Sequence, residues 1–206
     1  MKNFSNSENY KNAQTYSGGS AQLPIGAYKC KVIGAKEVSF DWGSRLEIAF
    51  DVIAGEHKDF FKKQFDANTS EDKKWKGVLR LNVPKDDGTE QDAWAMSRFK
   101  TTMQNFEDSN DGYTWNWDES TLKGKLIGII IRRRYTVIDK KDVGFNEAFR
   151  TITIENVENG NFAVPADYYD KNWKEAHGNA TADQSGKSDN GFMKIDTSTK
   201  EEEIPF

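Results

Sequence analysis

The chain has 206 residues and a mass of 23.5 kDa, a length that fits one compact domain with attached segments better than two full domains. Hydrophobic residues make up 36% of it, below the roughly 45 to 50% of an average globular protein, so part of the chain is expected to stay outside a packed core. The formal net charge is -4, a balance that neither indicates nor excludes a nucleic-acid partner.

Few residues are suited to metal or redox chemistry. Cys30 is the single cysteine, which excludes an intramolecular disulfide, and His57 and His177 are too few for a histidine-rich metal site. The longest apolar run, residues 126 to 131, is far shorter than the roughly 18 residues of a membrane span, and the first residues contain no apolar signal region. We therefore expect a cytoplasmic protein with no cofactor, no metal and no membrane contact.

Several segments in the first half of the chain alternate apolar and polar residues, as half-buried strands do. Residues 1 to 22 lack an apolar period and are expected to form a flexible arm. Strands are predicted at residues 27 to 38, 45 to 52 and 78 to 83, with a weaker one at 60 to 65. The second is the clearest, because its apolar residues occupy every other position.

A helix is predicted over residues 90 to 107. Its apolar stripe runs from Met96 through Phe99 and Met103 to Phe106, and Thr89 followed three residues later by Asp92 resembles a capping box.

Two further strands are predicted after the helix, at residues 126 to 135 and 151 to 157. The pair Asn159-Gly160 favours a tight hairpin from the second of them into residues 162 to 164.

This order of elements favours an OB-fold-like five-stranded antiparallel barrel, with one helix between strands 3 and 4 and an extra C-terminal hairpin strand. A β-sandwich with one helix is the alternative. The predicted organisation is a flexible arm (residues 1 to 22), an OB-like domain (23 to 166) and a disordered acidic tail (167 to 206).

The C-terminal end combines charge with an unusual tip. Residues 175 to 206 contain seven acidic and three basic residues, a balance equal to the net charge of the whole chain. The last six residues are Glu201, Glu202, Glu203, Ile204, Pro205 and Phe206. The proline limits the entropy lost on binding, the phenylalanine supplies an apolar anchor, and the acids attract a basic rim. A docking peptide is the favoured interpretation, and an acidic solubility tail is the alternative.

The tip resembles that of bacterial single-stranded DNA-binding proteins, in which such a sequence recruits replication, recombination and repair enzymes. The body, over roughly residues 22 to 166, is similar to single-stranded DNA-binding-like proteins of phages and prophages of Gram-positive bacteria. The residues that carry this second resemblance are Leu23-Pro-Ile-Gly-Ala-Tyr-Lys29, Phe99-Lys100, Ser109-Asn-Asp-Gly-Tyr-Thr-Trp115 and Leu122-Lys-Gly-Lys-Leu-Ile-Gly128. The chain departs from the family at Arg132-Arg-Arg134, where relatives carry acidic residues, so DNA contacts are not carried over there.

A binder of single strands needs cations for phosphates and aromatic faces for bases, and both are present outside the predicted core pattern. The candidate DNA-binding residues are Lys29, Lys31, Trp42, Arg45, Trp75, Arg80, Trp115, Arg132, Arg134 and Tyr135. Phe40 lies beside Trp42 in a predicted hairpin loop. Tyr113, Trp115 and Trp117 would share a face in an extended segment, where packing against the barrel end is the alternative role. Because Arg132, Arg133 and Arg134 are contiguous, a strand would divide them between two faces.

Together with these residues, the resemblance implies a non-enzymatic protein of phage or prophage replication or recombination. Its barrel would coat single-stranded DNA, and its tip would recruit host or phage enzymes. A recombination mediator or adaptor whose body binds protein is the main alternative, and an oligosaccharide-binding barrel ranks below it. The sequence leaves the homo-oligomeric state open.

Overall fold

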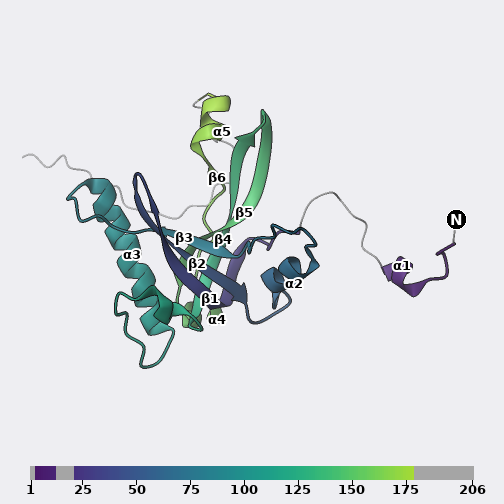
Figure 1. The fold of residues 1–206 in the computed structure, drawn as a ribbon, viewed down its shortest axis with the longest axis horizontal. Coiled ribbons are helices and arrows are strands. Elements are labelled where there is room, and N and C mark those ends of the chain that lie inside the picture. Colours follow the sequence, from purple (N-terminus) through teal and green to yellow (C-terminus); the bar gives the residue numbers. More distant parts are fainter. Residues whose placement is uncertain (1–2, 13–20, 179–206) are drawn as a thin grey trace, which may run out of the picture.

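The computed structural model describes residues 3–12 and 21–178 (Figure 1). Its strands are β1 (Gly26–Phe40), β2 (Gly43–Val52), β3 (Val78–Asn82), β4 (Leu126–Ile138), β5 (Lys141–Ile152) and β6 (Tyr168–Tyr169). Its helices are α1 (Glu8–Asn12), α2 (Phe60–Ala67), α3 (Glu90–Asp108), α4 (Ile154–Glu158) and α5 (Lys171–Ala176), with one 3-10 turn, η1 (Glu119–Leu122). The fold is mainly β, as predicted.

The strands form a six-stranded sheet with the order β3-β2-β1-β4-β5, and neighbours along this path are antiparallel. β1 pairs only with the first half of β4, and β6 pairs in parallel with β4 further along, at Arg134 and Tyr135. Within the described residues no pairing joins β3 to β5, so the sheet is not closed. The structure therefore confirms the mainly β class and the antiparallel sheet, but it does not confirm the expected barrel.

The core forms where the alternating strands face α3. Leu46, Ile48 and Phe50 of β2 are buried, as their alternation predicts. They pack with inward residues of β1, β3 and β4 and with one face of α3. The strands predicted at residues 27 to 38, 45 to 52 and 78 to 83 are thus confirmed as β1, β2 and β3, with the boundaries given above.

Helix α3 begins as its sequence predicts. The Thr89 hydroxyl accepts a hydrogen bond from the backbone N–H of Asp92 at 3.2 Å, which satisfies one of the free donors of the first turn. Phe99, Met103 and Phe106 are buried, but Met96 is exposed. The apolar stripe therefore reaches the core only from Phe99 onward.

The strand predicted at residues 60 to 65 is wrong, because this segment forms α2. The helix is fixed by a residue far from it in sequence. The buried carboxylate of Asp51, on β2, accepts hydrogen bonds from the backbone N–H groups of Phe61 and Lys62, each at 2.9 Å. These contacts satisfy first-turn donors of α2 and attach it to the sheet.

The strand predicted at residues 151 to 157 is also largely wrong. β5 lies earlier in the chain and ends at Ile152, and Thr153 then caps α4 by accepting a hydrogen bond from the N–H of Asn156. Asn159 and Gly160 end this short helix instead of forming a hairpin. The hairpin between β4 and β5 turns at Asp139 and Lys140, both with positive φ.

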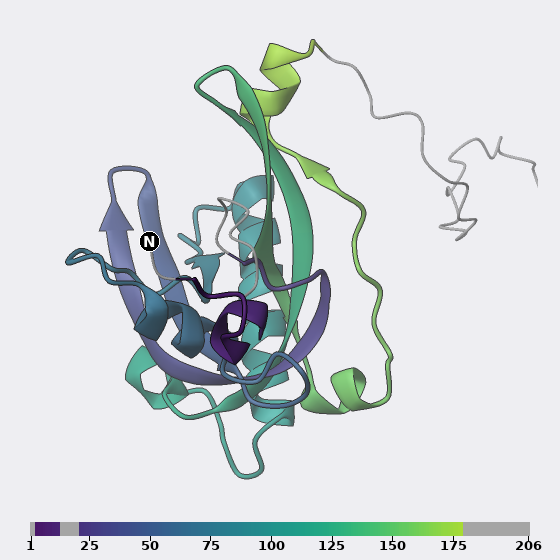
Figure 2. The same cartoon turned by 90° about the vertical axis from the view of Figure 1, so that its right-hand side faces the viewer.

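Two further elements, β6 and α5, follow the domain boundary expected at residue 166. They lie along the projecting β4–β5 hairpin (Figure 2). Residues 167–178 thus belong to the described fold. Within the segment expected to be a flexible arm, Glu8–Asn12 forms the short helix α1. The remainder of the predicted tail, including the tip Glu201–Phe206, lies outside the described residues.

Candidate nucleic-acid interface

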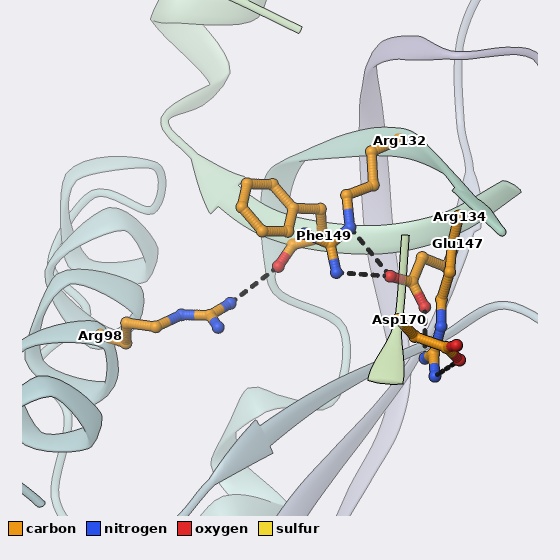
Figure 3. A network of polar contacts seen from close by, with 6 residues as sticks. All are labelled: Arg98, Arg132, Arg134, Glu147, Phe149 and Asp170. Atoms are coloured by element: carbon orange, nitrogen blue, oxygen red, sulfur yellow. Dashed lines mark hydrogen bonds and ion pairs between the residues drawn. The ribbon is translucent and has the colours of Figure 1, made fainter. Parts of the chain in front are cut away.

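A network of arginines and carboxylates covers the outer face of β4 and β5 (Figure 3). Arg132 and Glu147 are cross-strand neighbours, and the Arg132 guanidinium donates two hydrogen bonds to one Glu147 oxygen, at 2.9 and 2.7 Å. Arg134 lies on the same face and pairs with the second oxygen of Glu147 at 3.2 Å. One carboxylate thus holds two guanidinium groups side by side.

Arg134 is fixed from the other side by Asp170, the residue that caps α5. The Arg134 guanidinium donates to Asp170 at 2.9 Å. Burial favours the neutral acid, but hydrogen bonds from Arg134, from the Trp173 N–H and from Thr136 outweigh burial and lower the pKa of Asp170. Burial likewise disfavours the Arg134 cation, yet its two carboxylate partners raise its pKa. This ion pair attaches the segment after β6 to the sheet.

Aromatic rings alternate with the arginines on this face. The Arg132 guanidinium carbon lies 4.2 Å from the ring centre of Phe149 and 4.2 Å from that of Tyr168. Arg134 lies 5.6 Å from the ring of Phe145. Arginine stacked on aromatic rings keeps a defined orientation, which suits it to phosphates and bases.

Arg98 extends the network from β5 to α3. A bulge in β5 leaves Phe149 without a cross-strand partner between Ala148 and Arg150. The Phe149 carbonyl accepts a hydrogen bond from Arg98 at 2.9 Å, as Figure 3 shows. Burial, and then repulsion by Arg132 and Arg150, lowers the pKa of Arg98.

The network keeps a surplus of positive charge. Its cations are Arg98, Arg132 and Arg134, and its carboxylates are Glu147 and Asp170. The network thus has one guanidinium group more than it has carboxylates, and such a surplus of positive charge favours binding of an anion.

A groove of about 390 Å³ opens between the unpaired edges of β3 and β5. Arg80 of β3 and Arg134 of β4 line it together with the rings of Phe60, Phe61 and Phe145. Cationic and aromatic groups therefore meet along the open side of the sheet, which suits a phosphodiester chain with unstacked bases.

The tip of the β1–β2 hairpin presents a second aromatic surface. The rings of Phe40 and Trp42 are stacked with centres 5.0 Å apart and planes within 8°, although 37% and 50% of these residues stay exposed. Arg45 lies over Phe40, at 4.8 Å. Exposed, mutually supported rings of this kind can stack on bases.

Glu47 joins this hairpin to the groove. Its carboxylate accepts a hydrogen bond from Arg45 at 2.7 Å and lies 3.5 Å from Arg80, its cross-strand neighbour. Burial raises the pKa of Glu47, but the hydrogen bond from Arg45 and the charges of Arg45, Arg80 and Lys36 outweigh this effect and lower it. Arg45 and Arg80 are thus held between the hairpin tip and the groove.

The structure brings five of the predicted residues to this surface: Trp42, Arg45, Arg80, Arg132 and Arg134. The predicted division of the arginines is also found, because Arg133 turns to the opposite face and donates to Asn146. We call the surface formed by these five residues with Arg98, Glu147 and Phe149 the arginine–aromatic surface.

Other predicted residues lie elsewhere and have packing roles. The indole N–H of Trp75 donates to the carbonyl of Phe50 at 3.0 Å, and the Trp75 ring packs on Phe65. Trp115 packs edge-on against Phe99, while Tyr135 stacks on Tyr169 with ring centres 5.1 Å apart.

Lys29 and Lys31 lie on β1, away from the residues that line the groove. Lys29 forms an ion pair with Glu158 of α4. These two lysines are not brought together with the arginines.

Sequence reasoning missed several residues of this region, among them Arg98, Glu147, Phe149 and Tyr168. Phe145, Glu147 and Phe149 recur at the spacing of a strand, and this alternation is the signal that could have located β5. Arg98 gives no such signal, because its partner carbonyl lies 51 residues away.

A scan against protein-family models finds no family that matches this chain, and a search of curated proteins finds no match either. Within residues 3–12 and 21–178, no group of three or more His, Cys, Asp or Glu side chains is placed to hold a metal ion. None of the helices in these ranges combines the length and apolar character needed to cross a bilayer.

Proposed function

We propose that the protein binds single-stranded DNA without sequence preference, in phage or prophage replication or recombination. The observation that carries the proposal is the arginine–aromatic surface beside the open groove. Unbalanced guanidinium groups would hold phosphates, and the exposed rings of Phe40 and Trp42 would stack on bases. No catalytic role is proposed.

An OB-like architecture is part of this proposal. The sheet order and the position of α3 between β3 and β4 support it. In such a fold the gap between β3 and β5 corresponds to the seam of the barrel. The acidic tip, Glu201 to Phe206, is proposed to recruit partner enzymes, and its sequence is the support for that role.

Substitution of Arg80 tests the proposed surface with little risk to the fold. The Arg80 side chain is 58% exposed, and Glu47 keeps Arg45 as its partner when Arg80 is replaced. Arg80→Gln should weaken binding of a fluorescent oligo-dT about fivefold or more and reduce the salt dependence by about 0.7 in the slope of log K against log salt. Lys123→Gln, an exposed lysine outside the groove, is the control and should leave both unchanged. Equal behaviour of the two variants would contradict the assignment of the groove.

An adaptor whose body binds protein is the second candidate. It is favoured by the pairing of Arg132 and Arg134 with Glu147, which lowers the charge available to DNA. This candidate predicts that oligo-dT and duplex DNA bind equally weakly. It also predicts that Arg80→Gln leaves both affinities unchanged.

A further inference from the structure

A second cleft lies between α3 and β5, beside the arginine–aromatic surface, with a volume of about 490 Å³. This volume lies within the range of about 300 to 1,000 Å³ that is typical of small-molecule sites. The residues that matter for its chemistry are Trp94, Arg98, Asn105, Arg150, Asn156 and Phe162. The predicted DNA-binding set contains none of them.

The cleft is positively charged. Arg98 and Arg150 line it, and no carboxylate does. Within the described residues, the Arg98 side chain hydrogen-bonds only to a backbone carbonyl, and Arg150, which is exposed, forms no ion pair. Burial, and then repulsion by Arg132 and Arg150, lowers the pKa of Arg98, so an anion bound between Arg98 and Arg150 would relieve part of an unfavourable interaction.

Aromatic and amide groups surround the arginines. Trp94 is 61% exposed, and its ring is held in place by Arg98, whose guanidinium carbon lies 4.8 Å from the ring centre. The Asn105 amide donates to Thr151 at 2.9 Å, and the Asn161 amide donates to Asn156 at 3.2 Å. These bonds orient the side chains of Asn105 and Asn156. Within the described part of the chain, the amide oxygen of Asn105 and the amide nitrogen of Asn156 make no hydrogen bond. Oriented free amide atoms are suited to the polar edge of a base.

The cleft is connected to the proposed DNA surface. A smaller depression of about 60 Å³ between β3 and α3 is lined by both Arg80 and Arg98, and Trp94 lies in its wall. A strand bound in the groove and leaving it at Arg80 would therefore meet Trp94 and then the α3–β5 cleft.

We propose that the α3–β5 cleft is a nucleotide-binding subsite, in which Arg98 and Arg150 hold a phosphate and Trp94 stacks on the base. The main ligand would be a nucleotide of the single strand that continues from the groove, and in this respect the inference rests on the proposed function. The same chemistry would accept a free mononucleotide, and the experiment below separates the two sources.

The test uses the full-length protein, oligo-dT of about 8 and about 25 nucleotides, and dTMP alone. Arg150→Gln is the variant, because Arg150 is exposed and supports no other described side chain. Arg150→Lys is the partial rescue, and Lys123→Gln is the unrelated control. If the cleft extends the binding track, Arg150→Gln should weaken binding of the long oligomer about tenfold and change binding of the short one less than twofold.

Each result leads to one conclusion. A selective loss with the long oligomer supports a subsite for the strand, and saturable dTMP binding that Arg150→Gln abolishes supports a site for a free nucleotide. If wild-type protein binds oligo-dT, and Arg150→Gln changes neither oligomer nor dTMP binding, the subsite is wrong while the proposed function stands. If wild-type protein binds neither oligomer, the proposed function fails, and dTMP binding alone then decides the cleft.

Discussion

At the scale of single residues, Glu47 and Glu147 have the same role in positioning arginines. Each carboxylate contacts two arginines, Arg45 and Arg80 in one case and Arg132 and Arg134 in the other. A carboxylate shared in this way orders two guanidinium groups; Glu47 neutralises only one of its two partners, whereas Asp170 supplies a second carboxylate for Arg134. The surface therefore has cations that are held in place and still carry charge for a ligand.

Trp42 is the residue whose loss should most directly reduce stacking. Trp42→Ala removes an exposed ring that contacts the hairpin tip, so oligo-dT affinity should fall about 5- to 150-fold at constant salt, because one stacked base contributes roughly 1 to 3 kcal/mol. The free energy of unfolding should change by less than about 1 kcal/mol.

The matched control is Trp117→Ala, another exposed tryptophan, which packs on Phe99 on a different surface of α3. Fluorescence anisotropy measures the affinity and urea denaturation measures the stability. If both tryptophan variants bind oligo-dT as wild type does, the hairpin tip makes no stacking contact.

Asp170 should make the stability of the protein depend on pH in the acidic range. Its folded-state pKa lies below its ordinary value of about 4, so its stabilising contribution is present above pH 4 and is lost as the pH falls through the folded pKa. Asp170→Asn keeps a residue that can cap α5 but removes the charge opposite Arg134. We expect a loss of about 1 to 2 kcal/mol at pH 7 that shrinks toward pH 2.

Urea denaturation at several pH values checks this prediction. A difference between wild type and Asp170→Asn that stays constant from pH 7 to pH 2 would show that the carboxylate does not titrate with folding.

At the scale of elements, the β4–β5 hairpin organises the interface. β4 presents Arg132 and Arg134, and the bulge in β5 frees the Phe149 carbonyl for Arg98. The hairpin turn is unusual because neither Asp139 nor Lys140 is glycine, although both have positive φ. Such two-residue turns strongly prefer glycine at the second position, since left-handed backbone is unfavourable for residues with a Cβ.

Lys140→Gly should therefore stabilise the protein, by about 0.5 to 1 kcal/mol in the free energy of unfolding. Lys141→Gly, one residue further and inside β5, is the matched control and should destabilise it by a similar amount. Both are measured by urea denaturation. A destabilising effect of Lys140→Gly would mean that the turn in solution differs from the one described.

The elements differ in how far they could be predicted. The apolar alternation of β2 and the cap of α3 are local signals, and both predictions are confirmed. α2 was mistaken for a strand because Asp51, which satisfies its first turn, lies on another element. Thr151 to Val157 resemble a strand by alternation, but Thr153 caps a helix there. The hairpin between β4 and β5 could not be recognised from its turn, because neither Asp139 nor Lys140 is glycine.

The candidate site shows the same limit. Trp42, Arg45 and Arg80 lie outside the apolar alternation of their strands and loop, which is the signal that made them candidates. Arg98 depends on a contact between α3 and β5 that no local pattern reveals. Trp75 and Trp115 fit a stacking role by composition, yet they pack against the protein.

At the scale of the whole molecule, charge is divided between body and tail. The acidic excess of residues 175 to 206 equals the net charge of -4, so the remainder of the chain is neutral in sum. Within that remainder, one surface holds Arg45, Arg80, Arg98, Arg132 and Arg134. Acidic residues in the tail would compete with DNA for that surface.

Removal of residues 201 to 206 should therefore leave oligo-dT affinity equal or higher and abolish recruitment of a partner enzyme. Glu201, Glu202 and Glu203 together changed to Gln, with Ile204 to Phe206 retained, separates charge from the apolar anchor. Binding is measured by anisotropy and recruitment by pull-down from host lysate with identification of the captured enzymes. A truncated protein that captures the same enzymes as wild type would contradict the role of the tip.

The central claim is that the arginine–aromatic surface binds a single strand through phosphates and stacked bases. It is tested most directly by titrating the tryptophan fluorescence of the intact protein with a long oligo-dT and with duplex DNA at several salt concentrations. We predict quenching by the single strand, much weaker binding of the duplex, and a log–log salt slope of about -0.7 for each phosphate contacted. Equal binding of both DNAs, or no binding of either by fluorescence and by mobility shift, would contradict the account.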